Sequence, residues 1–373
     1  MHISYEKERD CLFFLGAGAS YSDGVPLQKD IIPMILSPKI KEFESSELRR
    51  DVSNFLRNNF SCSPENNIYP SLEVIFSYLD YFIDNDISLS SAYTINGLAE
   101  IKEELVKLIY YITSKSIKPQ NENSTDTTSS LYADFWKRMR KTKRNFSIIT
   151  TNYDNLLDNA FDGTLYPRYG LIDYCVDFLN YTEEDIAFNW WINPRDDIPE
   201  WKDYDLRPIK LIKIHGSLNW KYCHCCSHAI LTPWCTSIDL DTGILVRSID
   251  TDHESISRCA RDGHYLSTLI IPPSHNKILK HPVIQRLMNE SQEEIRKSKN
   301  IVFIGYSFPD SDIHIRALFK KNLNTNTKIT VINPDLPDEQ KSTYKGISAE
   351  INFIQKTFKE ALDDGIFETF LKS

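Results

Sequence analysis

The sequence predicts an α/β protein whose core is a doubly wound, mostly parallel, Rossmann-like sheet. Five short apolar runs each end abruptly in a turn or a helix start, as buried parallel strands do. Glycines or polar side chains follow every run, and a long helical segment separates the first run from the second. The runs comprise residues 11–15, 146–150, 209–214, 301–304 and 329–332.

The residues that follow these runs share one location in the predicted fold. In an open α/β sheet, ligands bind outside the carboxyl ends of the strands, where the connecting loops gather. The sequence therefore predicts one ligand site built from the residues at these ends. In chain order they are Gly16, Thr151, His215, Gly305 and Asn333.

Two segments differ in character from the sheet. Residues 41–145 are expected to form a helical insertion, because stretches such as 101–109 place apolar residues at helical spacing. Residues 221–265 gather Cys and His and are expected to form a small module, zinc-ribbon-like or degenerate. The pattern of residues 166–208 assigns them to neither. We expect the whole chain, 1–373, to be a single domain that carries both additions.

The composition excludes several classes of protein. A formal net charge of −9 argues against direct binding to nucleic acid or to an anionic membrane. No apolar run approaches the ~18 residues of a membrane span, and the N-terminus lacks the order of a signal peptide. Eight cysteines in 373 residues suit a reducing compartment better than a disulfide framework. The expected location is the cytoplasm.

The first motif is Gly-Ala-Gly-Ala-Ser at positions 16–20, directly after a predicted strand. Glycines there let the backbone approach a pyrophosphate, and the following helix N-terminus favours its negative charge. Tyr21 stands where the dinucleotide fingerprint has its third glycine. A tight turn without a ligand is the alternative interpretation.

The second motif is Thr151-Asn152-Tyr153-Asp154, just past a strand end. The amide of Asn152 can both donate and accept hydrogen bonds, so it can orient a water or a ribose hydroxyl. Alternatively, Thr151 or Asn152 caps the following helix, which these residue types do well.

The remaining motifs lie at three later strand ends. His215, followed by Gly216, is placed for general base work near neutral pH, although a lone histidine is more often structural. Gly305 and Ser307 are candidates for contacts with a ribose and phosphate, and Asn333 for the adenosine ribose. Plain loops are the alternative for these two motifs.

In this order, the five motifs resemble the sirtuin (silent-information-regulator-type) superfamily, and more closely its sirtuin-like NAD-hydrolase branch of prokaryotic antiviral defence. The resemblance covers the core from about residue 12 to 335 and leaves the insertions largely unmatched. It implies that NAD+ is the substrate and that Asn152, Asp154 and His215 are catalytic. The NAD+-binding residues that it implies are Gly16, Ala17, Gly18, Ser20, Thr151, Gly305, Ser307 and Asn333.

The implied reaction is hydrolysis of the nicotinamide–ribose bond to nicotinamide and ADP-ribose. Phosphates and Asp154 stabilise an oxocarbenium-like state, Asn152 positions a water, and His215 relays a proton. Deacetylating sirtuins continue Gly-Ile-Pro with Asp-Phe-Arg, whereas residues 27–29 are Leu-Gln-Lys here, and they carry Gln where this chain has Thr151. These departures favour hydrolysis. An NAD-dependent protein deacylase and a non-catalytic module that binds NAD+ or ADP-ribose are the alternatives.

The cysteine cluster resembles the sirtuin structural zinc site only in part. Cys223 and Cys226 form a Cys-x-x-Cys pair, whereas Cys259 has Asp262 where the second cysteine would stand. A structural zinc bound by these three cysteines and one histidine is one expectation, and reduced cysteines without metal are the other. No metal is expected to take part in catalysis.

The resemblance also implies partners and a biological role. It suggests a homo-oligomer that works with a HerA-like ATPase or, alternatively, with a short Argonaute protein. In that setting the enzyme depletes NAD+ during phage infection and aborts it.

Overall fold

The computed structural model describes most of the chain. The described residues are 5–37, 39–116, 130–142, 145–165, 171–178, 182–183, 186–187, 195, 208–232, 236–240, 245–247, 258–259, 261–275, 277 and 279–371.

The central sheet confirms the predicted fold class. Within the described residues it has seven strands in the order β14-β13-β12-β1-β2-β6-β3, and every neighbouring pair is parallel. Each of the five predicted runs forms one of these strands, while the edge strands β3 and β14 have no counterpart among the predictions. The strands are β1 (Arg9–Leu15), β2 (Phe146–Thr150), β3 (Leu171–Asp173), β6 (Pro208–Lys213), β12 (Ser298–Ile304), β13 (Lys328–Ile332) and β14 (Ile351–Ile354).

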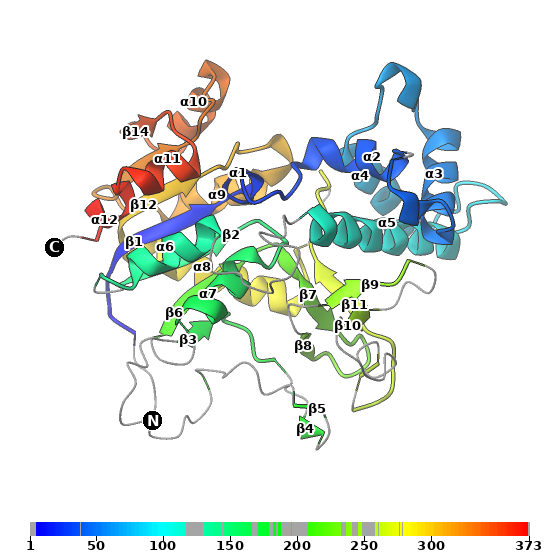
Figure 1. Cartoon of the computed structure of the whole chain (residues 1–373), viewed down its shortest axis with the longest axis horizontal. Coiled ribbons are helices and arrows are strands. Elements are labelled where there is room, and N and C mark those ends of the chain that lie inside the picture. The colour runs from blue at the N-terminus through cyan, green and yellow to red at the C-terminus, as the bar shows by residue number, and fades with distance from the viewer. Residues whose placement is uncertain are drawn as a thin grey trace.

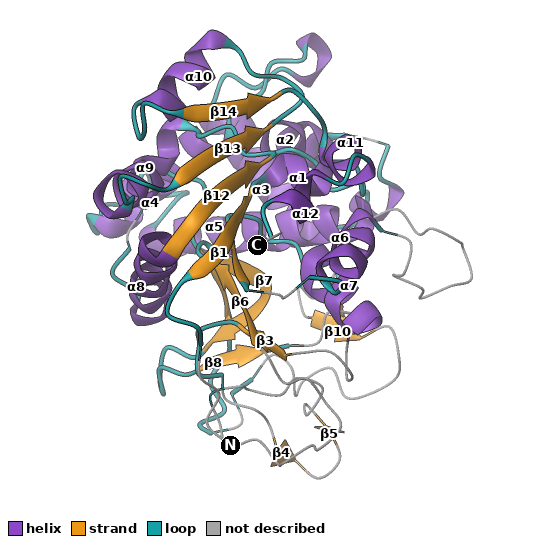
Figure 2. Ribbon diagram, turned by 90° about the vertical axis from the view of Figure 1, so that its left-hand side faces the viewer, coloured by secondary structure: helices purple, strands orange, loops and turns teal. Residues whose placement is uncertain are grey.

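Helices cover both faces of this sheet, as Figure 2 shows. The inner strands are therefore buried on both sides, which explains why their sequences read as continuous apolar runs. One face carries α8 (Pro282–Lys297) and α9 (Ile313–Asn322). The other carries α6 (Leu131–Met139), α7 (Leu156–Leu165), α11 (Phe358–Asp363) and α12 (Ile366–Thr369); α10 (Asp338–Lys345) lies beside β14.

The helical insertion has a hydrophobic core separate from that of the sheet. Figure 1 shows its helices grouped at one end of the molecule. The group begins before residue 41, because α2 contributes Ile31 and Ile35 to that core, and α6 packs against α7 although it falls inside the expected range. Its members are α2 (Gln28–Leu36), α3 (Glu47–Asn59), α4 (Leu72–Asp84) and α5 (Ile95–Ser116).

A small antiparallel sheet follows β6 and supports the cysteine cluster. Its strands β7 (Gly216–Tyr222), β8 (Ala229–Leu231) and β11 (Ser267–Ile270) lie in the order β11-β7-β8. Residues 223–228 connect β7 to β8. Two further two-stranded sheets are formed by β4 (Thr182–Glu183) with β5 (Ile186–Ala187), and by β9 (Thr236–Ile238) with β10 (Leu245–Arg247). None of the helices in the described residues is both long and apolar enough to cross a bilayer.

Candidate active site at the carboxyl edge of the sheet

The predicted glycine loop lies where the chain reverses its winding direction. β1 and β12 are neighbours, but the chain passes from β1 toward β2 and from β12 toward β13, on opposite sides. The loops after these two strands meet in backbone contact: the Gly18 N–H donates to the Gly305 carbonyl at 2.8 Å. Ligands of doubly wound proteins bind in the crevice at such a switch point.

Three glycines at this point are required by packing. A Cβ at Gly16 would lie 2.6 Å from the Cα of Tyr306, and one at Gly18 would lie 2.9 Å from that of Gly305. Gly305 has a φ of +58°, and its Cβ would lie 2.4 Å from the Ala19 nitrogen. The loops therefore approach each other as closely as backbones can. The Gly18 amide that was expected to meet a phosphate is bonded to the neighbouring loop in this conformation.

Asn152 is held against the glycine loop by its side-chain amide. Its Nδ2 donates to the Gly16 carbonyl at 2.9 Å and to Ser20 Oγ at 3.0 Å. Ser20 is fully buried, and its hydroxyl also bonds Tyr132 Oη at 2.9 Å. Ser20, predicted as a phosphate contact, thus lies behind Asn152 and fixes its amide. Thr151, beside it, is tied to β1 by its N–H, which donates to the Leu15 carbonyl at 3.2 Å.

Asp154 is buried and bonded to the start of α7. Its Oδ1 accepts the Leu156 N–H at 3.1 Å, so this residue, rather than Thr151 or Asn152, meets the first free amide of the helix. Burial raises the pKa of Asp154, while the nearby Lys213 ammonium opposes that rise. Lys213 Nζ donates to the Asp154 carbonyl at 2.6 Å and to Asp158 at 3.0 Å, which anchors the backbone of the second motif.

His215 belongs to a buried cluster that the motifs alone do not reveal. Its side chain is only 4% exposed, and its Nε2 lies 2.8 Å from Nε2 of His314, so one imidazole N–H donates to the other. Asp312 Oδ1 lies 3.8 Å from the same Nε2. Lys277 forms an ion pair with Asp312, and Tyr306 Oη donates to that carboxylate at 2.7 Å.

Burial sets the charge states in this cluster. Burial is the main reason that the pKa of His215 is lowered to about 3 and that of His314 to about 4. The Lys277 ammonium also lowers both pKa values, whereas the Asp312 carboxylate raises them. For Asp312, burial alone would raise the pKa, but His215, Lys277 and the hydrogen bonds hold it below its usual range. Near neutral pH both histidines are therefore uncharged, and Asp312 is an ionised carboxylate paired with Lys277.

Two geometric features bring His215 beside Asn152. The Ile214 N–H donates to the Thr150 carbonyl at 3.0 Å, which continues the register of β6 on β2 past the strand ends. The Tyr153 ring of the second motif packs near His215, with its centroid 6.4 Å from that of the imidazole. The second and third motifs therefore meet at one edge of the sheet, as the sequence predicts.

Ser307 and Asn333 lie at the same edge, beyond the switch point. Ser307 follows β12 and is exposed, and Asn333 follows β13 and is half-buried. Ala17 begins α1 (Ala17–Tyr21), next to the loop of Gly305. Apart from Ser20, which is buried behind Asn152, the predicted substrate-binding residues lie in the segments that directly follow β1, β2, β12 and β13.

Sequence reasoning missed several residues of the site. Asp312 and His314 follow the Gly305 motif closely, and their spacing of two was a usable signal. Lys277 and Tyr132 reach the site from 35 residues or more away in the chain, and nothing in their local sequence marks them. Their roles depend on tertiary packing alone.

The cysteine cluster gathers the three predicted thiols, but its fourth member is Asp262 instead of a histidine. Cys226 Sγ and Cys259 Sγ are 3.6 Å apart, and Cys223 Sγ lies 3.3 Å from an Asp262 oxygen. A tetrahedral zinc with Zn–S bonds of about 2.3 Å separates its sulfurs by about 3.8 Å. The donor set therefore fits a structural zinc. Cys235 and His253 lie outside the described residues.

The fold and this edge define a doubly wound α/β protein with its polar site at the switch point. The model of the SIR2-like domain family matches residues 147–350, more than half of the chain. The chain belongs to the SIR2-like domain family. The matched range includes Asn152, His215, Gly305 and Asn333 and begins after the glycine loop.

Comparison with solved structures gives weaker likenesses. One is a Sir2 variant with a deacetylated p53 peptide and 3′-O-acetyl ADP-ribose, at 12% identity and a TM-score of 0.42, covering 98% of this chain and 96% of that one. Another, from work on sirtuin substrate affinity, has 12% identity and a TM-score of 0.41, covering 97% and 95%. No curated protein matches the sequence.

Proposed function

We propose that this protein is an NAD+ glycohydrolase that cleaves the nicotinamide–ribose bond. The observation that carries the proposal is that Asn152 and His215 follow the paired strands β2 and β6 at the carboxyl edge of the sheet, with Asn152 bonded to the switch-point Gly16. Membership of the SIR2-like family supports NAD+ as the substrate. Hydrolysis is favoured over deacylation because residues 27–29 are Leu-Gln-Lys, whereas deacetylating sirtuins have Asp-Phe-Arg at these positions. In this chain α2 already begins at Gln28.

Asn152 is suited to position the attacking water. Both of its N–H bonds go to protein acceptors, Gly16 and Ser20, so its amide plane is fixed. The Oδ1 atom of Asn152 can then accept a hydrogen bond from the attacking water. A water held in this way has already lost most of its translational and rotational entropy, so less of that entropy is lost in reaching the transition state and the barrier is lower.

His215 is suited to accept the proton. With a pKa of about 3 it is neutral at physiological pH but a weak base, so it holds the proton only transiently. Asp312, 3.8 Å away, then stabilises the imidazolium that forms. Asp154 contributes by holding the Asn152 loop on α7 as well as by its charge.

The test is to identify the products of NAD+ incubated with purified protein by chromatography, with and without an acylated lysine peptide. The proposal predicts nicotinamide and ADP-ribose in equal amounts, independent of the peptide. Peptide-dependent release of O-acyl-ADP-ribose would instead identify a deacylase. Calorimetric titration with NAD+ measures the site even when turnover is slow, and absence of both binding and turnover would contradict the proposal.

We further propose the biological setting that the resemblance implies. The enzyme acts in the cytoplasm as a homo-oligomer and depletes NAD+ in antiphage defence, under control of a HerA-like ATPase or, alternatively, a short Argonaute. Co-purification with the products of neighbouring genes, followed by the NAD+ assay, tests this assignment. A rate of NAD+ hydrolysis that the partner leaves unchanged would speak against control by a partner.

A further inference from the structure

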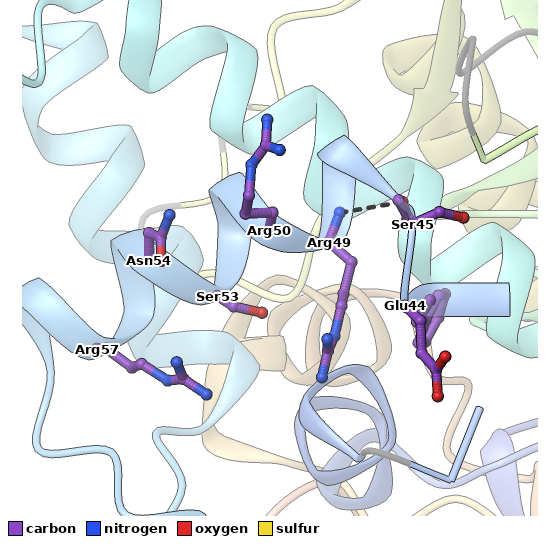
Figure 3. Close-up of a pocket in the computed structure, with 9 residues that line it drawn as sticks. Glu44, Ser45, Arg49, Arg50, Ser53, Asn54 and Arg57 are labelled. Carbon is purple, nitrogen blue, oxygen red and sulfur yellow. Dashed lines mark hydrogen bonds between the residues drawn. The ribbon is translucent and has the colours of Figure 1, made fainter. Parts of the chain in front are cut away.

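A polar hollow of about 160 Å³ lies on the helical insertion and shares no lining residue with the predicted NAD+ site (Figure 3). Arg49 and Arg57 of α3 line it, with Glu44 as its acidic member, so the lining carries net positive charge. Arg50 lies at its border, but its guanidinium is paired with Glu47. Phe43, which is 1% exposed, contributes to its apolar part. The catalytic cluster makes no use of these residues.

Arg49, Ser53 and Arg57 form a ladder on one face of α3. They are spaced at i, i+4 and i+8, which places their side chains one above another along the helix. Figure 3 shows the Ser53 hydroxyl between the Arg49 and Arg57 side chains, whereas the Arg50 guanidinium points away from them. Arg49 and Arg57 therefore lie about two turns apart, with Ser53 on the turn between them.

Ser53 supplies an independent sign of a ligand. It is 6% exposed, and its Oγ has no hydrogen-bond partner among the described residues. A serine within a helix ordinarily bonds back to the carbonyl four residues earlier. A buried hydroxyl without a partner costs free energy, and an acceptor placed in the hollow would remove that cost.

The two flanking arginines retain donors for an anion. Arg49 uses Nε and Nη2 to bond the carbonyls of Ile35 and Leu36 at the end of α2, which leaves Nη1 without a partner within the described chain. Arg57 forms no ion pair with any described residue, whereas Arg50 is paired with Glu47 at 3.0 Å. Guanidinium groups bind phosphate oxygens through charge-assisted, often bidentate, hydrogen bonds.

We propose that this ladder is a binding site for the phosphate or diphosphate group of a small metabolite such as a nucleotide. Arg57 and the free Nη1 of Arg49 bind phosphate oxygens, and Ser53 donates its hydroxyl to a third. Because Arg49 also holds the end of α2, the bound ligand stabilises the junction between α2 and α3. None of these residues belongs to the proposed NAD+ site, so this binding proposal stands whether or not the protein hydrolyses NAD+.

The test is calorimetric titration of the full chain with inorganic pyrophosphate, for wild type, Arg57→Gln, Ser53→Ala and Arg50→Gln. Arg50→Gln is the matched control, because it removes the same charge from the same helix but not from the ladder. We expect Kd to rise at least about tenfold in Arg57→Gln and about fivefold in Ser53→Ala, with little change in Arg50→Gln. Any binding at the glycine loop is common to all four proteins.

Ser53→Ala also separates binding from folding. Removing an unpartnered buried hydroxyl should leave the melting temperature unchanged or raise it, while binding weakens. Equal affinities in all four proteins, or equal weakening by Arg50→Gln and Arg57→Gln, would overturn the proposal. So would tighter binding of a single-stranded oligonucleotide that competes with pyrophosphate, since the ligand would then be a nucleic acid.

Discussion

The two central residues of the site owe their placement to neighbours far away in sequence. His215 bonds a histidine 99 residues later in the chain, and Asn152 bonds a glycine 136 residues earlier. Motif spacing predicted that Asn152 and His215 would meet, because parallel strands end at a common edge. It could not predict their partners. The partner of His215, for example, depends on how the start of α9 packs against the turn between β6 and β7.

At this scale, Lys277→Met should change the pH dependence of NAD+ hydrolysis. Lys277 lowers the pKa of His215, and Asp312 raises it, so loss of the ammonium should raise that pKa. We expect the acid limb of kcat/KM to move upward by about one pH unit. Lys280→Met is the control, since Lys280 is exposed in the same segment. An unchanged pH profile in a folded Lys277→Met protein would contradict the charge assignment.

Among the elements, the five inner strands of the parallel sheet were predictable from their apolar runs, and the edge strands and the small antiparallel sheet were not. β2 coincides with its predicted run, residues 146–150. β14 has four residues and lies half-exposed at the edge, so its sequence alternates instead of forming an apolar run. The small sheet of β7, β8 and β11 was missed because it surrounds the polar and cysteine-rich segment. The pairing of these three strands is set by contacts between segments that are far apart in the chain.

Gly305→Ala tests the contact between the loops after β1 and β12. The new Cβ would lie 2.4 Å from the Ala19 nitrogen at a φ of +58°, so the loops must separate. We expect a loss of about 3 kcal/mol or more in the free energy of unfolding, measured in urea. Gly263→Ala is the matched control, because Gly263 also has a positive φ of +72° but has open space around it. That change should cost only about 1 kcal/mol.

The cysteine module should bind zinc through Asp262. Protein purified without added metal or chelator should contain about one zinc per chain by elemental analysis. Asp262→Ala should lower the zinc content, because this carboxylate lies within 3.4 Å of Cys223 Sγ. His264→Ala, which removes the nearby histidine instead, should leave it unchanged. The reverse result would restore the histidine ligand expected from the sequence.

For the whole molecule, the buried neutral histidines predict that stability falls in acid. The folded pKa values of His215 and His314, about 3 and 4, lie below the ordinary value of 6.5. The unfolded chain therefore binds more protons below pH 6.5, and the folded state loses stability as pH falls from there. Each histidine contributes up to about 1.4 kcal/mol per pH unit.

Urea midpoints between pH 7 and pH 5 measure this effect. The lowered pKa values of Asp312 and Glu294 lie below that window, so those groups contribute little to the slope there. Glu104, whose pKa burial raises to about 7, binds a proton in the folded state and opposes the histidine contribution, so the slope is compared between wild type and variant. His281, whose pKa burial also lowers, adds a smaller share. The double variant His215→Asn, His314→Asn should flatten the pH dependence. A slope as steep as that of the wild type would mean that the two histidines are not buried and neutral.

The measurement that tests the central claim most directly is the rate of NAD+ hydrolysis by Asn152→Ala and His215→Ala. Asn58→Ala and His224→Ala are matched controls, because both residues lie away from the carboxyl edge and, within the described residues, their side chains hydrogen-bond Tyr93 and Ser267 respectively. We predict a loss of about 100-fold or more in each site variant and near wild-type rates in both controls. Full activity in Asn152→Ala or His215→Ala would place the chemistry elsewhere and contradict the account.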